Sequence, residues 1–251
     1  MTSYLPGVVV IGAKGRMGTR IVSLIEAQGD LVAARIDQEG PALDEALGAA
    51  ARCVVDFSTV GQVRQTLDFC VAHKVPLVLG TTGLTPDDDA AVSSAANHIP
   101  IVSSPNFSVG VHVLLGLVSE AARLLDEGWD AELVEAHHRQ KVDSPSGTAL
   151  ALAQRLVAAR GAGLAETAAY GRHGIVGARP RGEVGIHAVR GGTVVGEHTV
   201  TFFGEGEVVT LEHRALDRDI FARGAVRAAT WLMSEARPPN RYGLGDVLRR
   251  D

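Results

Sequence analysis

The feature that most constrains the fold is the alternation of short apolar runs with helical patterns over the first half of the chain. Residues 8–11, 31–36, 53–57, 75–79 and 99–102 are short apolar runs typical of buried strands. Residues 17–27 and 60–73 carry apolar side chains at helical spacing. Strands joined by helices need crossover connections, which make the strands parallel within one sheet covered on both faces. The first half therefore predicts an α/β fold with a doubly wound parallel sheet.

The pattern changes after Asn106. Residues 109–127 and 148–160 predict helices on either side of a strand at 131–136, and the Gly/Ala-rich residues 161–182 predict an extended loop. Three strand-like runs follow at 183–189, 193–202 and 207–214, and the glycine turns between them favour an antiparallel arrangement. A last helix is expected at 219–236. The second half thus predicts a separate α+β domain with a mixed, largely antiparallel sheet.

Composition and charge exclude several classes of protein. The chain of 251 residues has a net charge of −5, which argues against a general nucleic-acid surface. No apolar run approaches the roughly 18 residues that a membrane-spanning helix needs, and residues 1–7 lack the basic and apolar regions of a secretion signal. Cys53 and Cys70 lie in apolar segments without CxxC spacing. We therefore expect two reduced core thiols in a cytoplasmic protein with no membrane or nucleic-acid partner.

Gly12, Gly15 and Gly18 mark the junction between the first strand and the first helix. Their G-x-x-G-x-x-G spacing differs from the usual G-x-G-x-x-G, but the physical requirement is the same. Glycine permits a tight turn, and the helix N-terminus offers free N–H groups to a pyrophosphate. Asp37 follows Gly18 by 19 residues and ends the second strand, where a ribose hydroxyl is bound. The combination predicts a dinucleotide site; the alternative is a turn that needs glycine only for its tightness.

Polar residues also follow the fourth and fifth predicted strands, at 80–83 and 103–107. Parallel sheets bind ligands at these carboxyl ends, so threonine and asparagine here are candidates for hydrogen bonds to a ribose or a nicotinamide amide. The same residue types also serve as ordinary turn formers. Asp37 favours a cofactor with two free ribose hydroxyls, whereas Lys14 and Arg16 favour a 2′-phosphate. We therefore expect NADH, NADPH or both as the cofactor.

The stretch from Glu135 to Ala149 concentrates acid–base groups just ahead of a helix. His137 and His138 emerge at the tip of a predicted strand, where successive side chains point to opposite sides. Lys141 follows in a loop, and a protonated lysine near an anionic substrate can both bind charge and deliver a proton. The turn at 146–148 opens the next helix, where backbone N–H groups and a hydroxyl suit a carboxylate. The stretch predicts a catalytic site for a small anion.

Each part of this stretch also has a purely structural interpretation. The Ser-Pro-Ser-Gly-Thr sequence at 144–148 is compatible with a simple helix cap after a proline turn, and Lys141 with a solvated surface charge. The two histidines are possible zinc ligands, but no cysteine or carboxylate lies at metal-ligand spacing beside them, so we expect no metal site.

The sequence Glu-Ala-His-His-Arg-Gln-Lys-Val-Asp-Ser-Pro-Ser-Gly-Thr-Ala at 135–149 resembles the defining motif of the 4-hydroxy-tetrahydrodipicolinate reductase (dihydrodipicolinate reductase) family of lysine biosynthesis. Further similar segments follow in family order across nearly the whole chain. They lie at 12–18, 55–58, 80–83, 106–110, 187–190, 195–198 and 221–227.

The resemblance implies a fold, a cofactor site and a set of catalytic roles. It implies a Rossmann-type dinucleotide-binding domain at 1–107 completed by 218–251, a substrate and oligomerisation domain at 108–217, and a homotetramer. It assigns acid–base catalysis to His137, proton donation to Lys141, and contacts with a dicarboxylate substrate to His138, Gly147 and Thr148. The cofactor contacts that it implies are Gly12, Ala13, Lys14, Gly15, Arg16, Met17, Asp37, Gly80, Thr81, Thr82, Ser104, Pro105, Asn106 and Phe107.

We therefore expect a reductase that transfers hydride from NADH or NADPH to a cyclic imine dicarboxylate and then protonates the ring through Lys141 or His137. Two alternatives remain at this point. A related dehydrogenase acting on an amino acid or a semialdehyde is one, although neither Cys53 nor Cys70 lies in a loop suited to a nucleophile. The other is a nonenzymatic NAD(P)-sensing module, which would have no use for His137 and Lys141.

Overall fold

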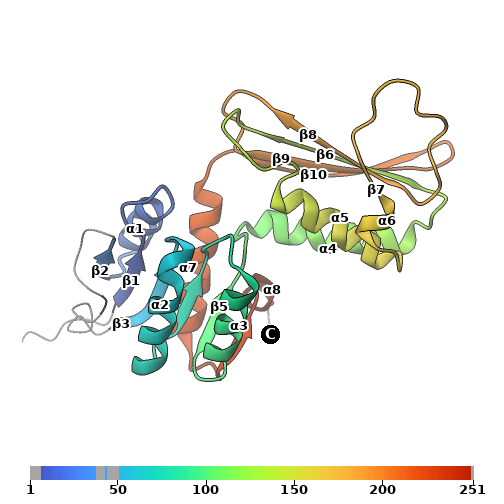
Figure 1. The fold of residues 1–251 in the computed structure, drawn as a ribbon. Helices are drawn as coiled ribbons and strands as arrows, with labels where there is room; N and C mark the ends of the chain where they lie inside the picture. Colours follow the sequence, from blue (N-terminus) through green and yellow to red (C-terminus); the bar gives the residue numbers. More distant parts are fainter. Residues whose placement is uncertain (1–6, 38–42, 44–50, 250–251) are drawn as a thin grey trace, which may run out of the picture. The chain divides into compact units, whose positions relative to one another are not determined.

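The computed structural model describes residues 7–37, 43 and 51–249. The expectation that the chain carries no secretion signal falls almost entirely on residues 1–6, outside this range. The chain divides into two compact units, which are Met1–Val109 together with Arg218–Asp251, and Gly110–Asp217 (Figure 1).

The first unit is built on a six-stranded sheet in the order β11-β5-β4-β3-β1-β2. Every pair of neighbouring strands is parallel, which confirms the predicted doubly wound sheet. The strands are β1 (Gly7–Ile11), β2 (Val32–Ile36), β3 (Ala51–Asp56), β4 (Leu77–Leu79), β5 (Pro100–Ser103) and β11 (Asn240–Tyr242). β1 is buried along its whole length because helices cover both faces of the sheet.

Helices pack on the two faces of this sheet in two separate apolar clusters. α1 (Gly18–Ala27), α7 (Asp219–Ser234) and α8 (Leu244–Leu248) contribute to one cluster. α2 (Val60–His73) and α3 (Pro86–Ala95) contribute to the other. α3, α8 and β11 were not predicted from the sequence. α3 begins with a capping box, in which Thr85 and Asp88 exchange hydrogen bonds, and with Pro86 in its first turn. Few of its residues are buried, so its apolar pattern is weak.

The second unit contains a five-stranded sheet in the order β10-β9-β6-β8-β7. Its strands are β6 (Asp130–His137), β7 (Ala168–Tyr170), β8 (Val184–Arg190), β9 (Gly196–Phe203) and β10 (Val208–Ala215). α4 (Val109–Leu124) and α5 (Gly147–Ala159) bury one face of this sheet, and Leu133, Leu152 and Phe202 lie in the shared core. Figure 1 shows both helices along the same side of the sheet.

Two expectations for the second unit were wrong. β9 is antiparallel to both β6 and β10, but β8 is parallel to β6 and to β7. The sheet is thus mixed, as predicted, and β8 runs antiparallel to β9. The two strands form no hairpin because β6 lies between them, and a strand's residue pattern does not encode which strand is its partner. The predicted loop at 161–182 also contains a short helix, α6 (Leu164–Thr167), and the edge strand β7. Within that region, residues 161–163 and 171–182 lack a helix or strand.

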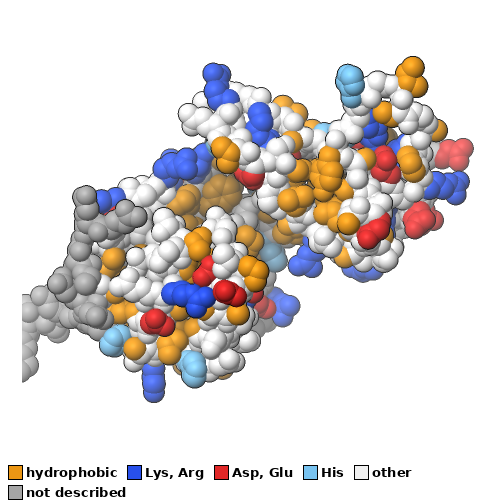
Figure 2. All heavy atoms as spheres, in the orientation of Figure 1, with side chains coloured by type: hydrophobic (Ala, Val, Ile, Leu, Met, Phe, Trp, Pro, Cys, Tyr) orange, Lys and Arg blue, Asp and Glu red, His pale blue; other side chains and the backbone are white. Residues whose placement is uncertain are grey.

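The surface of the described residues carries charges of both signs. On the face drawn in Figure 2, basic and acidic side chains are interspersed rather than gathered in one patch. None of the helices among the described residues combines the length and the apolar character that a membrane span requires. The same residues hold no group of His, Cys, Asp and Glu side chains arranged to bind a metal ion.

Candidate active site

The glycine loop of the first unit is closed tightly onto itself between β1 and α1. Gly12 has a φ of +77°, and a Cβ added at Gly18 would lie only 2.0 Å from the carbonyl oxygen of Gly12. The backbone N–H of Gly15 donates to that same carbonyl over 2.9 Å. Only glycine fits this approach, so the loop has the conformation that brings backbone N–H groups close to a phosphate.

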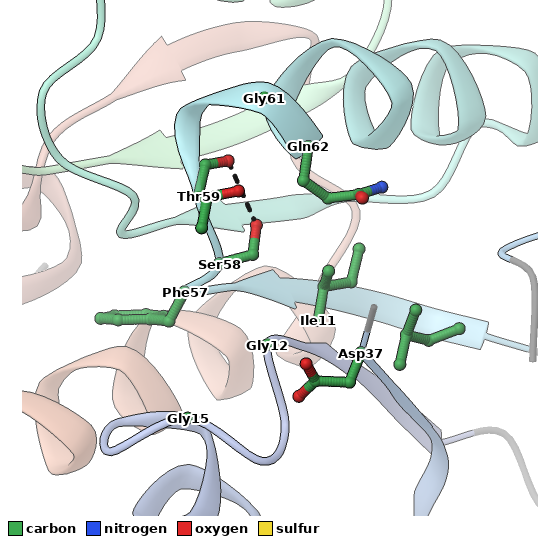
Figure 3. Close-up of a pocket in the computed structure, with 10 residues that line it drawn as sticks. Ile11, Gly12, Gly15, Asp37, Phe57, Ser58, Thr59, Gly61 and Gln62 are labelled. Atoms are coloured by element: carbon green, nitrogen blue, oxygen red, sulfur yellow. Dashed lines mark hydrogen bonds between the residues drawn. The ribbon is translucent and has the colours of Figure 1, made fainter. Parts of the chain in front are cut away.

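Asp37 lies directly after β2 and is bound to the glycine loop. The backbone N–H of Lys14 donates to Oδ2 of Asp37 over 2.7 Å. The carboxylate thus links the end of β2 to the loop after β1, and in Figure 3 it lies beside Gly12. Lys14 and Arg16 are exposed.

A cavity of about 410 Å³ opens next to these residues (Figure 3). The predicted residues Gly12, Gly15 and Asp37 line it, together with Ile11, Ile36, Phe57, Ser58, Thr59, Gly61 and Gln62. The last five come from the end of β3 and the start of α2, and none of them was predicted to contact the cofactor. They reach the cavity because β3 pairs directly with β1. The segment at 55–58, already singled out by its resemblance, was the available signal.

A fully buried aspartate fixes the turn after β3. Asp56 accepts hydrogen bonds from the amide and hydroxyl of Ser58 at 2.9 and 2.6 Å. It also accepts from the hydroxyls of Thr66 at 2.7 Å and Thr81 at 3.1 Å. The Thr81 hydroxyl is thus engaged inside the protein, and Asp56 ties the ends of β3 and β4 and the helix α2 together.

The predicted cofactor residues after β4 and β5 lie at neighbouring strand ends without lining this cavity. Gly80 follows β4, and its lack of a side chain leaves room for the ring of Phe57, because a Cβ there would lie 2.2 Å from Cζ of Phe57. Ser104 donates to the carbonyl of Asn106 over 2.6 Å. The ring of Phe107 is buried, with its centroid 5.5 Å from that of Phe57. Thr82 and Pro105 are exposed.

The residues of this unit fit a dinucleotide. The glycine cradle leaves no room for a Cβ at Gly18, a carboxylate stands at the end of β2, and a cavity adjoins both. These are the elements that bind a pyrophosphate and a ribose at the carboxyl edge of a parallel sheet.

The second unit places the predicted acid–base residues at the end of β6. His137 is the last residue of β6 and is buried. Its Nδ1 lies 2.6 Å from Oε2 of Glu135. Its ring meets that of His198, on β9, edge to face with centroids 5.2 Å apart. His198 in turn lies within 3.1 Å of the Ser146 hydroxyl through Nε2.

Burial dominates the proton affinity of both imidazoles. It lowers the pKa of His137, and the nearby cations Lys141 and Arg190 act in the same direction, while the Glu135 carboxylate opposes them. Burial likewise lowers the pKa of His198 to about 4, so His198 is neutral at physiological pH.

Lys141, His138 and the start of α5 complete the set of predicted residues. Nζ of Lys141 lies 2.8 Å from Oδ1 of Asp143, in the loop after β6. His138 is half-buried, and its buried Nδ1 has no hydrogen-bond partner among the described residues. Gly147 and Thr148 form the first turn of α5, where Ser146 caps the helix by accepting from the Ala149 amide at 3.1 Å. A Cβ at Gly147 would meet nothing within 4 Å, so that helix end is open.

Comparisons with known proteins place both units in one family. Residues 7–107 match the family model described as dihydrodipicolinate reductase, N-terminus, and residues 110–248 match dihydrodipicolinate reductase, C-terminus. The chain is 46% identical to 4-hydroxy-tetrahydrodipicolinate reductase of Anaeromyxobacter dehalogenans, covering 96% of this chain and 97% of the relative. It is 43% identical to the reductase of the same name from Myxococcus xanthus, covering 96% of each.

Solved structures agree with these matches. A dipicolinate-bound dihydrodipicolinate reductase from Paenisporosarcina sp. TG-14 superposes with a TM-score of 0.75 at 25% identity, over 97% of this chain and all of that one. A second solved structure, GenD2 from gentamicin A biosynthesis in complex with NAD, shares the fold, with a TM-score of 0.56 at 16% identity over 98% of this chain and 91% of that one. The chain therefore belongs to the dihydrodipicolinate reductase family.

Proposed function

We propose that this chain catalyses the reduction of 4-hydroxy-tetrahydrodipicolinate to tetrahydrodipicolinate with NADH or NADPH, in the biosynthesis of diaminopimelate and lysine. The observation that carries the proposal is the match of both units to this family over nearly the whole chain. The two sites support it independently, because a dinucleotide cradle and a buried acid–base cluster are what a hydride transfer followed by a protonation needs.

The first unit holds the cofactor in this proposal. The N–H groups of the glycine loop at Gly12–Met17 bind the pyrophosphate, and Asp37 binds a ribose. The residues after β4 and β5, from Gly80 to Thr82 and from Ser104 to Phe107, hold the nicotinamide end. When bound, the reduced nicotinamide supplies the hydride. Asp37 and the pair of Lys14 and Arg16 leave both NADH and NADPH possible.

The second unit binds the substrate and supplies the proton. The open N-terminus of α5 at Gly147 and Thr148 is suited to a substrate carboxylate, and His138 offers an unsatisfied nitrogen beside it. The proton that quenches charge on the ring comes from Lys141 or from His137 in its protonated form. Because burial lowers the pKa of His137, the structure favours Lys141 as the donor at neutral pH.

We further propose a homotetramer formed through the face of the second sheet that α4 and α5 leave uncovered. Val134, Val189, Phe203 and Val208 are exposed on that face. Exposed apolar side chains on a sheet face that no helix covers suit an association site. Light scattering of the purified chain tests the tetramer.

We also propose a cytoplasmic location, because Cys53 and Cys70 are buried and form no disulfide.

The direct test is an absorbance assay with both cofactors. The substrate is generated in the cuvette by condensing pyruvate with aspartate semialdehyde using the preceding synthase, and oxidation of NADH or NADPH is followed. Turnover that depends on the synthase and on this chain supports the proposal. A chain that binds NADPH or NADH but oxidises neither would favour the sensing module instead.

A further inference from the structure

Glu135 is a fully buried carboxylate at the point where the acid–base residues meet. It lies on β6 two residues before His137, so both side chains point to the same face of the sheet. Its two oxygens accept four hydrogen bonds. They come from Nδ1 of His137 at 2.6 Å, the amide of Ser146 at 3.0 Å, and both terminal nitrogens of Arg190 at 2.8 and 2.7 Å.

We propose that Glu135, paired with Arg190, is the positioning residue of the active site, holding His137 in one tautomer and fixing the loop that carries Lys141. The inference rests on the proposed function for its kinetic consequences, while its structural part concerns the free chain alone.

The tautomer follows from what surrounds the imidazole of His137. A carboxylate accepts hydrogen bonds and cannot donate, so the proton of neutral His137 is held on Nδ1. Nε2 is then left at the opposite edge of the ring, over the backbone of Gly196, where an added Cβ would lie 3.0 Å from it. The glycine on β9 thus leaves space for the ring that Glu135 orients from β6.

Arg190 extends the same control to the loop that follows β6. It lies opposite His137 in the register between β6 and β8, which brings its guanidinium onto Glu135. Its Nη2 also donates to the backbone carbonyl of Asp143 over 2.7 Å, and the Asp143 side chain pairs with Lys141 at 2.8 Å. One ion pair therefore fixes the ends of two strands, the lysine loop and, through Ser146, the start of α5.

The charges around this site oppose one another. Burial alone would raise the pKa of Glu135, but the bonds from Arg190, His137 and Ser146 outweigh it and lower that pKa. The groups that face His137 are Glu135, which raises its pKa, and the cations Lys141 and Arg190, which lower it, with neutral His198 packed against the ring. Removing the carboxylate leaves only groups that lower the pKa of His137.

The test uses Glu135→Gln, which keeps the shape and removes the charge, and Glu135→Asp, which keeps the charge on a shorter stem. Glu120→Gln, at an exposed ion pair with Arg123 on α4, is the matched control. Nitrogen-15 NMR of the imidazoles gives the tautomer and titration of His137 without any substrate. Steady-state kinetics over a range of pH gives kcat and KM separately.

We expect wild-type His137 to be protonated on Nδ1 in its neutral form. In Glu135→Gln we expect the titration of His137 to move to lower pH and kcat to fall about 10²-fold, the scale of a general acid–base contribution, with cofactor affinity unchanged. Glu135→Asp should recover part of the rate, and Glu120→Gln should match wild type.

Several results would overturn the inference. A wild-type His137 protonated on Nε2 is one. A folded Glu135→Gln variant with an unchanged His137 titration and unchanged kcat is another. If Glu135→Gln does not fold, Glu135→Gln/Arg190→Met removes both charges of the ion pair together, and a wild-type kcat in that protein would contradict the inference. Absence of turnover in the wild type would defeat the proposed function but not the NMR result.

Discussion

Replacing Gly18 by alanine tests whether the glycine loop binds the cofactor through its exact backbone position. A Cβ at Gly18 would lie 2.0 Å from the Gly12 carbonyl oxygen and 2.7 Å from the Ala13 Cα, whereas Cβ contacts below 3.0 Å essentially never occur. Both neighbours are backbone atoms, so no side chain can swing away. The loop and the start of α1 must separate by about 1 Å, a displacement that can cost about 10²-fold at a site built on orientation.

The energetic scale agrees with that estimate. Overpacking typically costs about 1–3 kcal/mol of folding stability. A displaced loop that loses a similar amount of cofactor-binding free energy weakens affinity about tenfold for each 1.4 kcal/mol. We therefore expect Gly18→Ala to bind NADPH or NADH about 10- to 100-fold more weakly than wild type.

Calorimetric titration measures this affinity, and thermal unfolding checks that the variant is folded at the temperature used. Gly116→Ala on α4 is the matched control, because a Cβ there meets nothing within 4 Å. Gly18→Ala binding within twofold of wild type, in a folded protein, would refute the assignment of the loop to the cofactor.

Two further substitutions probe the second unit. The Glu132 carboxylate is hydrogen-bonded to Arg172, Arg179 and His187. Burial alone would raise the pKa of Glu132, but these partners lower it from 4.5 to about 2. A folded pKa below the unfolded one adds stability above about pH 4.5 that is lost as the pH falls toward 2, with a ceiling of about 3 kcal/mol at 1.36 kcal/mol per pKa unit. After screening by solvent we expect Glu132→Gln to lower the free energy of unfolding by about 1–2 kcal/mol at pH 7 and by less at pH 4; urea unfolding that shows the same difference at both pH values would contradict this. Gly196→Ala places a methyl 3.0 Å from Nε2 of the active-site imidazole, so kcat should fall several-fold while calorimetry shows unchanged cofactor affinity, and an unaltered kcat would show that this nitrogen has no role.

The sequence was most informative where local pattern and burial coincide. The expected helix at 60–73 matches α2, and the parallel sheet followed from the alternation of strands and helices. α3 escaped prediction because it buries only Asp88, Val92 and Ala95 and so lacks a clear apolar stripe. The pairing of β8 with β6 escaped because periodicity gives which side chains share a face and not which strand is the partner.

The candidate site likewise contains residues that could be predicted from the sequence and residues that could not. Gly12, Gly15 and Asp37 were predicted because their spacing along the chain carries the signal. Phe57 and its neighbours reach the cavity only through the pairing of β3 with β1. Arg190 meets Glu135 only through the register of β6 with β8, across 55 residues of sequence. Contacts created by sheet pairing are invisible to motif spacing.

The measurement that tests the central claim most directly is the coupled assay with Lys141→Ala beside wild type, each also titrated with NADPH and NADH. We predict that wild type oxidises the cofactor only when pyruvate and aspartate semialdehyde are condensed by the synthase. We predict that Lys141→Ala binds the cofactor as wild type does while its kcat falls by about 10²-fold or more. A Lys141→Ala variant that turns over at the wild-type rate would contradict the assignment of the Glu135–Thr148 segment to catalysis.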